Sequence, residues 1–306
     1  MKTTFVGAGA MGGLIGGIMT EAGEDVQLVD IWEEHVLAIK ERGIEIQRDG
    51  ESRSVALDIT TDFRETRPAD LVIVFTKGYD TPEAARAASH VLAPGGVVLT
   101  LQNGLGNAEV LAETLPPDVV IAGTTAFAST LLGPGRLLHG GAGPTHIGAF
   151  AGAPREKVEG VAALLNRVGI PTEVQDDVDS LVWTKFLLNC AANAVVALCH
   201  MNNGDIMNLP VTMELSEGLL KEGLAVAESL GIRIRPDIMD YYWKVLKEVG
   251  KNRASMGQDA DARRRTEIDT LNGAIVRLGR ERGMETPLNF ALTALIKTWE
   301  NQYLKK

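Results

Sequence analysis

Three polar residues recur at every fourth position of an otherwise apolar stretch. Lys185, Asn189 and Asn193 lie in the segment VWTKFLLNCAANAVV. This spacing places all three side chains on one face of a helix. A buried amine or amide needs a hydrogen-bonding partner, and lysine is rarely buried without one. A polar network between helices would provide partners, but a bound polar ligand explains the set better.

This helix face could transfer a proton. Burial lowers the pKa of a lysine ammonium because the charged form loses its hydration. If the pKa of Lys185 falls toward neutrality, the side chain can protonate a nascent alkoxide. Lys185 is therefore the candidate proton donor of a carbonyl reduction.

A glycine pattern lies near the N-terminus, between a β-prone run at Thr3–Val6 and a helical pattern that extends to about Ala22. In the G-x-G-x-x-G motif, the first glycine permits a tight turn and the second lets the backbone approach a pyrophosphate. The third allows close packing of helix on strand, and the helix N-terminus offers N–H donors to phosphate. The predicted dinucleotide-binding residues are Gly7, Ala8, Gly9, Ala10, Met11 and Gly12.

An acidic residue, Asp30, follows the next predicted strand, Val26–Val29. An acid at this position accepts hydrogen bonds from the ribose hydroxyls of NAD and repels a 2′-phosphate. The residues that follow, Ile31-Trp32-Glu33-Glu34, add acid and no arginine. We therefore predict NAD(H) over NADP(H). Asp30 could also cap the helix that begins near Trp32, and the two roles can coexist.

Further polar residues follow two apolar strands. Lys77 comes after one strand, and the loop Gln102-Asn103-Gly104-Leu105-Gly106 comes after the next. Loops at this edge of a parallel sheet face the bound nucleotide. We therefore expect Lys77 and the loop to contact cofactor or substrate. Ser255 and Glu267 considered alone indicate only solvated helix faces, and His139 and His146 indicate structural histidines at strand ends.

The first half of the chain alternates strand and helix patterns, which predicts a doubly wound parallel sheet of the Rossmann type. Leu71–Phe75 and Gly96–Leu101 are continuous apolar runs, as in central strands that are covered on both faces. The helix Thr81–Leu92 is the expected crossover between them. The polar segment Ile44–Ile59 indicates an antiparallel excursion. Two further strands are expected at Val119–Ala122 and His139–Ile147.

The second half carries only helical periodicity. We expect a domain boundary near residue 176, with a dinucleotide-binding domain at 1–176 and an all-helical substrate-binding domain at 177–306. A ligand cleft is expected between them. The predicted helices span Val178–Leu198, Val211–Leu230, Pro236–Lys251, Arg263–Arg282 and Leu288–Leu304.

The composition excludes several classes of protein. The chain has 306 residues, and 30 basic against 40 acidic residues give a net charge of −10. This balance argues against binding to nucleic acid or an anionic membrane surface. Two cysteines, Cys190 and Cys199, are expected to be buried free thiols in a reducing compartment. No cluster of histidine, cysteine and carboxylate has metal-ligand spacing, and no long apolar run indicates a membrane span, so we expect a cytoplasmic protein.

The chain resembles the ketopantoate reductase (2-dehydropantoate 2-reductase) family over nearly its whole length. The first matching pieces are GAGAMG, TKGY, QNGLG and PTHIG, and the later ones are WTKFLLNCAAN, NNGD, SMGQD and RTEIDTLNG. A lysine followed by asparagine at this spacing also occurs in other β-hydroxyacid dehydrogenases. Lys185 together with Asn189, Asn193 and Asn203, followed by Ser255 and Glu267, is much more specific.

The resemblance implies a role for each matched residue. Lys185 matches the general acid of the family, and Glu267 matches a residue that supports the reaction centre beside the nicotinamide. Asn103 matches a residue that touches both substrate and cofactor, Lys77 a cofactor-side lysine, and Ala126–Ser129 a further contact on the nicotinamide side. The residues that match the substrate's carboxylate and hydroxyl contacts are Asn189, Asn193, Asn203 and Ser255.

The resemblance implies reduction of the C2 ketone of 2-dehydropantoate to pantoate, as in pantothenate and coenzyme A biosynthesis. Family members commonly use NADPH and carry a basic residue near the end of the second strand, where this chain has Asp30. Relatives with the same framework reduce other branched 2-oxo acids to D-2-hydroxy acids, often with NADH. An NAD-dependent D-2-hydroxyacid dehydrogenase is therefore one alternative, and a non-catalytic dinucleotide sensor is another. A homodimer is expected.

Overall fold

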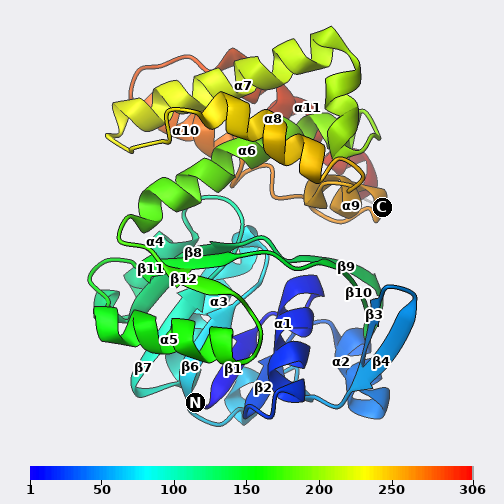
Figure 1. Ribbon diagram of the computed structural model, residues 1–306, viewed down its shortest axis with the longest axis vertical. Coiled ribbons are helices and arrows are strands. Elements are labelled where there is room, and N and C mark those ends of the chain that lie inside the picture. Colours follow the sequence, from blue (N-terminus) through cyan, green and yellow to red (C-terminus); the bar gives the residue numbers. More distant parts are fainter. Residues whose placement is uncertain (305–306) are drawn as a thin grey trace. The chain divides into compact units, whose positions relative to one another are not determined.

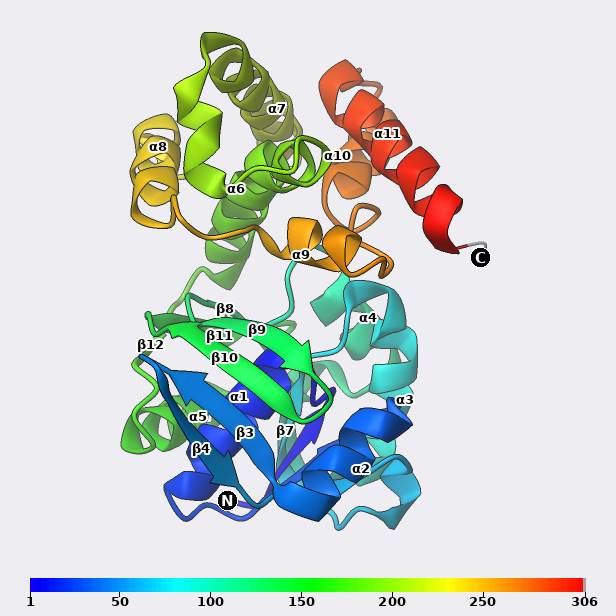
Figure 2. The same ribbon diagram turned by 90° about the vertical axis from the view of Figure 1, so that its right-hand side faces the viewer.

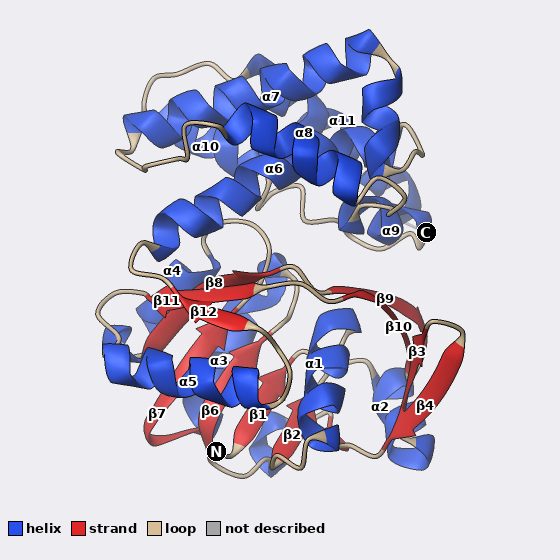
Figure 3. Cartoon of the chain, viewed as in Figure 1, coloured by secondary structure: helices blue, strands red, loops and turns tan. Residues whose placement is uncertain are grey.

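The computed structural model describes residues 1–304, which form two compact units (Figure 1). The α/β unit comprises Met1–Gln102 and Gly106–Val178, and the helical unit comprises Asn103–Leu105 and the chain from Asp179 onward. Strands occur in the α/β unit, whereas the helical unit is built from helices (Figure 3). This architecture confirms the predicted α/β fold, with an N-terminal parallel sheet and a C-terminal helical region. The predicted functions of the two parts stay predictions.

An eight-stranded sheet forms the centre of the α/β unit, in the order β12-β11-β8-β7-β6-β1-β2-β5. All neighbouring strands run parallel except β8 and β11. In the strand β6, Leu71–Val74 are buried without exception, so both faces of the sheet are covered. The strands are β1 (Thr3–Val6), β2 (Val26–Val29), β5 (Asp58–Thr60), β6 (Ala69–Val74), β7 (Leu92–Thr100), β8 (Val120–Thr125), β11 (Thr145–Ala149) and β12 (Thr172–Val174). The helices are α1 (Ala10–Glu21), α2 (Glu33–Arg42), α3 (Thr81–Val91), α4 (Asn107–Thr114) and α5 (Arg155–Arg167).

A second sheet of four strands, in the order β4-β3-β10-β9, lies across α1 (Figure 2). Its strands are β3 (Ile44–Arg48), β4 (Glu51–Val55), β9 (Ala128–Gly133) and β10 (Arg136–Gly141). Glycines of α1 allow the close contact, since a Cβ at Gly13 would lie 2.7 Å from Ile44 and 3.1 Å from Leu137.

This second sheet corrects two predictions. The predicted single strand His139–Ile147 is wrong, because β10 and β11 belong to different sheets and the Gly- and Pro-containing segment between them changes direction. The predicted excursion Ile44–Ile59 is antiparallel only in β3 and β4. Its last part forms β5, which pairs in parallel with β2 at the edge of the main sheet.

The helical unit has one predominantly buried helix, α6, with the other helices packed around it. Phe186, Leu187 and Val196 on α6 are almost fully buried in the core of this unit. By length and composition alone α6 could cross a membrane, but its apolar residues form the core of the unit, as in a central helix of a globular domain. The helices are α6 (Val178–Leu198), α7 (Pro210–Ser229), α8 (Ile238–Glu248), α9 (Ser255–Asp261), α10 (Asn272–Glu281) and α11 (Pro287–Leu304), with a 3-10 turn η4 (Asn203–Asn208).

Two predictions for this unit are wrong. The predicted helix Arg263–Arg282 forms only from Asn272 onward, and the residues before it, up to Leu271, are irregular. Cys190 is buried as expected, but Cys199 is exposed. It lies beyond the end of α6, where Arg253 donates hydrogen bonds to the carbonyls of Val196 and Met201, at 2.7 and 2.6 Å.

Candidate functional site

The glycine loop after β1 has a distinct requirement at each of its three glycines. Gly7 has a φ of +96°, and a Cβ there would lie 2.7 Å from the Thr76 nitrogen. A Cβ at Gly12 would lie 1.9 Å from the Gly7 carbonyl oxygen. A Cβ at Gly9 would meet no atom within 4 Å. The protein itself therefore requires glycine at the first and third positions, while the second faces open space that a ligand can enter.

Backbone donors surround this open position. Gly9 is the N-cap residue of α1, and it has no side chain that could accept a hydrogen bond from the first turn of the helix. Four consecutive backbone N–H groups here donate no hydrogen bond to an acceptor within residues 1–304. They belong to Gly9, Ala10, Met11 and Gly12. Free N–H groups at a helix N-terminus suit a phosphate. The loop therefore fits the pyrophosphate of a dinucleotide.

Asp30 follows β2 directly and is connected to the loop. Its Oδ2 accepts a hydrogen bond from the Ala8 N–H at 2.7 Å, and its Oδ1 accepts one from the Trp32 N–H at 2.9 Å. Trp32 is the N-cap residue of α2. The carboxylate of Asp30 thus links the glycine loop to the start of α2, and the carboxylate is only partly buried.

The ends of β6 and β7 are connected by a polar network. The side-chain amide of Gln102 donates to the Thr76 carbonyl and to the Thr81 hydroxyl, both at 2.9 Å. Thr81 in turn donates to the side chain of Asn107 at 2.8 Å. Lys77 lies between these segments, at the N-cap of a 3-10 turn, η2 (Gly78–Asp80), and is partly buried. This edge is therefore braced by its own side chains.

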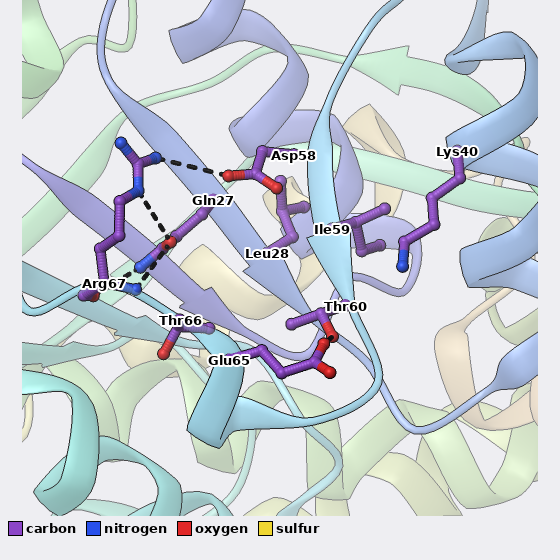
Figure 4. Close-up of a pocket in the computed structure, with 9 residues that line it drawn as sticks. All are labelled: Gln27, Leu28, Lys40, Asp58, Ile59, Thr60, Glu65, Thr66 and Arg67. Carbon is purple, nitrogen blue, oxygen red and sulfur yellow. Dashed lines mark hydrogen bonds and ion pairs between the residues drawn. The ribbon is translucent and has the colours of Figure 1, made fainter.

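A cavity of about 290 Å³ lies elsewhere on the α/β unit, beside β5 (Figure 4). Its polar side chains bind one another: Arg67 pairs with Asp58 at 3.4 Å, and the Thr60 hydroxyl donates to Glu65 at 2.6 Å. The cavity contains none of the predicted site residues. We interpret it as a feature of the sheet edge.

The structure places Lys185, Asn189 and Asn193 on the single helix α6, as their spacing predicts. Asn193 is only 6% exposed, and Asn189 is partly buried. Neither side-chain amide forms a hydrogen bond with any other residue of the described chain. The polar atoms of these two amides are not among the fully buried atoms that lack a partner, so they keep some access to solvent. These two groups are therefore available to a ligand.

The environment of Lys185 changes its acidity. Burial lowers the pKa of Lys185 from 10.5 to about 8, and the Glu267 carboxylate opposes this effect by raising the pKa. Glu267 is itself 7% exposed. A lysine with a pKa close to physiological pH can both hold and release a proton, which an ordinary lysine does poorly.

Glu267 lies on the irregular segment that precedes α10. The N–H of its neighbour Thr266 donates to the buried carboxylate of Glu300 on α11 at 2.5 Å. The Thr270 carbonyl accepts a hydrogen bond from the Leu105 N–H at 3.2 Å, and a Cβ at Gly104 would lie 2.7 Å from that carbonyl oxygen. Asn103 therefore belongs to the same compact unit as Glu267, although it follows a strand of the main sheet. Glu300 carries no motif in the sequence that would have indicated this role.

Asn203 and Ser255 come from two segments that are held together. The Asn203 N–H donates to the Asn252 carbonyl at 3.0 Å, and its side-chain amide lies 3.5 Å from the Val249 carbonyl. Ser255 begins α9, three residues after Asn252, and is partly buried. Their placement in one site with Lys185 stays a prediction.

The Rossmann-type α/β unit, its glycine loop and the helical unit define the class of dehydrogenases and reductases with a helical C-terminal part. Two family models narrow this class. Residues 3–152 match the model "Ketopantoate reductase PanE/ApbA", and residues 177–300 match "Ketopantoate reductase PanE/ApbA C terminal". The chain belongs to the ketopantoate reductase family.

Individual relatives agree with this family. The chain is 36% identical to a 2-dehydropantoate 2-reductase of Halobacterium salinarum, covering 97% of this chain and 98% of the relative. A 2-dehydropantoate 2-reductase of Pyrococcus abyssi is 34% identical, with 97% of each chain covered. Both names describe oxidoreductases.

Solved structures are similar over the whole chain. A PanE/ApbA family ketopantoate reductase from Ralstonia eutropha matches with a TM-score of 0.91 and 32% identity, covering 99% of this chain and 100% of that one. A D-mandelate dehydrogenase in ternary complex with NADH and anilino(oxo)acetate matches with a TM-score of 0.95 and 26% identity, over 99% and 100% of the two chains.

The glycine loop generates a prediction with a built-in control. Gly9→Ala should fold normally, because its Cβ meets no protein atom, but should raise the Kd for NADH by about tenfold or more by obstructing the phosphate. Gly12→Ala should lower the free energy of unfolding by about 1–3 kcal/mol through overpacking against Gly7. Thermal unfolding and a fluorescence titration with NADH measure both effects. Unchanged NADH binding by Gly9→Ala would show that no phosphate approaches the loop there.

Proposed function

We propose that this protein reduces the C2 ketone of 2-dehydropantoate to pantoate with a nicotinamide dinucleotide. The observation that carries the proposal is the partly buried Lys185 side chain, with its pKa lowered to about 8, on the same helix as the asparagine amides of Asn189 and Asn193. Membership of the ketopantoate reductase family supports the substrate.

Lys185 is the proposed proton donor. Its ammonium binds the ketone oxygen, where negative charge develops during reduction, and a fixed positive charge beside that oxygen stabilises it. As the C2–H bond forms, a proton passes from Nζ to the oxygen and leaves a neutral amine, which regains a proton from solvent. Glu267 favours the charged amine before the reaction by raising its pKa.

The asparagine amides are the proposed substrate holders. The Nδ2 groups of Asn189 and Asn193 can donate to the substrate's carboxylate or hydroxyl, because no other residue of the described chain uses them and they are not fully buried. We propose that Asn203 and Ser255 complete this set. Fixing the ketone relative to the Lys185 amine converts binding energy into rate, since the reacting groups no longer have to be brought together.

The α/β unit is the proposed cofactor holder. A bound dinucleotide supplies the hydride that C2 receives. The amides of the glycine loop hold its pyrophosphate, and Asp30 accepts hydrogen bonds from the adenosine ribose, which favours NAD(H) over NADP(H). We assign further cofactor contacts to Lys77, Asn103 and Glu267. The space beside Gly9 and the unpaired first-turn amides support the proposed position of the pyrophosphate.

A second candidate is an NAD-dependent D-2-hydroxyacid dehydrogenase that acts on bulkier 2-oxo acids. Two observations favour it: Asp30 at the end of β2, and the similarity to a D-mandelate dehydrogenase that binds NADH. A non-catalytic dinucleotide sensor is less well supported, because a sensor needs no proton donor such as Lys185.

We propose that the protein is a cytoplasmic homodimer. Apolar side chains on α7 and α11 are exposed, including Val211 at 67%, Leu295 at 54% and Phe290 at 51%, and they support a homodimer. The net charge of −10 and the two free cysteines support a cytoplasmic location. No group of three or more potential metal ligands is present in residues 1–304.

A substrate and cofactor panel tests the proposal directly. Oxidation of NADH and of NADPH should be followed by the loss of their absorbance at about 340 nm. The two substrates to compare are 2-dehydropantoate and, as the bulky alternative, phenylglyoxylate. We expect the highest kcat/KM for 2-dehydropantoate with NADH. Faster turnover of phenylglyoxylate would favour the second candidate, and binding of NADH without turnover of either acid would favour a sensor.

Lys185 generates a prediction about pH. Reduction requires the ammonium, so kcat/KM for the 2-oxo acid should be constant below a pH of about 8 and fall as pH rises through that value. Lys185→Ala should lose about 10²–10⁴-fold in kcat while its Kd for NADH is kept. Lys185→Arg is the matched control, since it keeps the charge but cannot release a proton. Unchanged turnover in Lys185→Ala would remove this residue from the mechanism.

Asp30 generates a prediction about cofactor preference. Asp30→Ala should weaken NADH binding more than NADPH binding. The substitution removes the hydrogen bond between Asp30 and the Ala8 N–H, which holds the glycine loop for both cofactors. Only NADH also loses a contact between its ribose and the Asp30 carboxylate. Glu33→Ala removes an exposed acid three residues away and should leave the ratio of the two Kd values unchanged. An equal loss for NADH and NADPH in Asp30→Ala would contradict the role of Asp30 in selectivity.

A further inference from the structure

A buried histidine of α2 joins three parts of the α/β unit. His35 is 0% exposed. Its Nε2 lies 3.0 Å from the carbonyl oxygen of Ala8 in the glycine loop, and its Nδ1 lies 3.0 Å from the backbone nitrogen of Gly135, in the turn between β9 and β10. The indole of Trp32 stacks on the imidazole, with 5.1 Å between ring centroids and 6° between planes.

These partners determine the tautomer of His35. The Gly135 N–H can only donate, so Nδ1 must accept and carries no proton. The Ala8 carbonyl can only accept, so Nε2 must carry the proton and donate it. Neutral His35 with the proton on Nε2 is therefore the one form that satisfies both contacts.

The Ala8 residue is consequently held on both sides. Its N–H donates to the Asp30 carboxylate at 2.7 Å, and its C=O accepts from His35 at 3.0 Å. The peptide bond between Ala8 and Gly9 is trans, so its C=O and N–H point in opposite directions. With the C=O fixed on His35, the Gly9 N–H is directed away from the imidazole. In the described part of the chain this N–H has no acceptor.

We propose that His35 is a positioning residue for the dinucleotide: it fixes the Ala8–Gly9 peptide so that the Gly9 N–H points at the pyrophosphate. The inference rests on the proposed function, because it assumes that a dinucleotide binds the glycine loop. His35 does not touch the ligand. It acts by preventing rotation of one peptide plane, which would replace an N–H donor with a repulsive carbonyl oxygen.

Two variants separate positioning from packing. In His35→Gln the side-chain amide nitrogen can take the position of Nε2 and donate to Ala8, but nothing accepts from Gly135. In His35→Asn the side chain can take the position of Nδ1 and accept from Gly135, but it does not reach Ala8. Each variant loses one buried hydrogen bond, so we expect both to lower the melting temperature by similar amounts.

The two variants should differ in how strongly they bind the dinucleotide. His35→Asn should raise the Kd for NADH and for ADP, which carries the pyrophosphate without nicotinamide, by about tenfold. His35→Gln should stay within about threefold of the unmodified protein. The KM for NADH should rise in His35→Asn while kcat at saturating NADH is unchanged. Equal losses in both variants, or wild-type binding by His35→Asn, would overturn the proposal.

A measurement on the unmodified protein does not depend on the folding of a variant. Nitrogen-15 NMR of the His35 ring should show a protonated Nε2 and a bare Nδ1, both with and without NADH. A proton on Nδ1 would overturn the proposal. If the unmodified protein binds neither NADH nor NADPH, the proposed function fails, and the proposal fails with it. If NADH binds normally and only the His35 result is contrary, the proposed function stands.

Discussion

The helical unit holds a partly buried amine, that of Lys185. The interior lowers the pKa of Lys185 to about 8, and a charged group in such a place needs compensation. Glu267 provides part of it, and the N–H of its neighbour Thr266 donates to the buried carboxylate of Glu300 on α11. The irregular backbone before α10 thus places Glu267 next to a residue, Thr266, whose N–H is bonded to Glu300.

In the α/β unit, the surrounding residues fix the conformation of the glycine loop. Gly7 and Gly12 must be glycine because of their protein neighbours, whereas Gly9 has space that the protein leaves unused. Asp30 and His35 hold Ala8 from opposite sides. A loop fixed in this manner needs no rearrangement to bind a phosphate, which is the advantage of a preorganised site. The second sheet contributes through Gly135, so strands outside the main sheet also support the loop.

The features that local spacing defines were predictable from the sequence. The repeat at Lys185, Asn189 and Asn193 indicated a single helix face, and the glycine pattern indicated a strand–turn–helix unit; the structure has both. Strand pairing was less predictable because it depends on distant segments. Nothing local in His139–Ile147 shows that its two ends join different sheets.

Other features depended on tertiary contacts. The segment before α10 has helical periodicity, but its hydrogen bonds to α11 and to Leu105 replace helical ones. Cys199 follows an apolar run, yet α6 ends before it and leaves it exposed. His35 lies in a charged segment, EEHVLAIK, that looks solvated. Its position four residues before the buried Ile39 was the only sign that it faces inward.

The proposed proton transfer depends most directly on the acidity of Lys185. Carbon-13 NMR of labelled lysine side chains, with the Lys185 signal assigned by Lys185→Arg, measures this acidity without any substrate. We predict a titration midpoint at a pH of about 8. A midpoint near the ordinary value of 10.5 would contradict the claim that the helical unit prepares this amine to give up a proton.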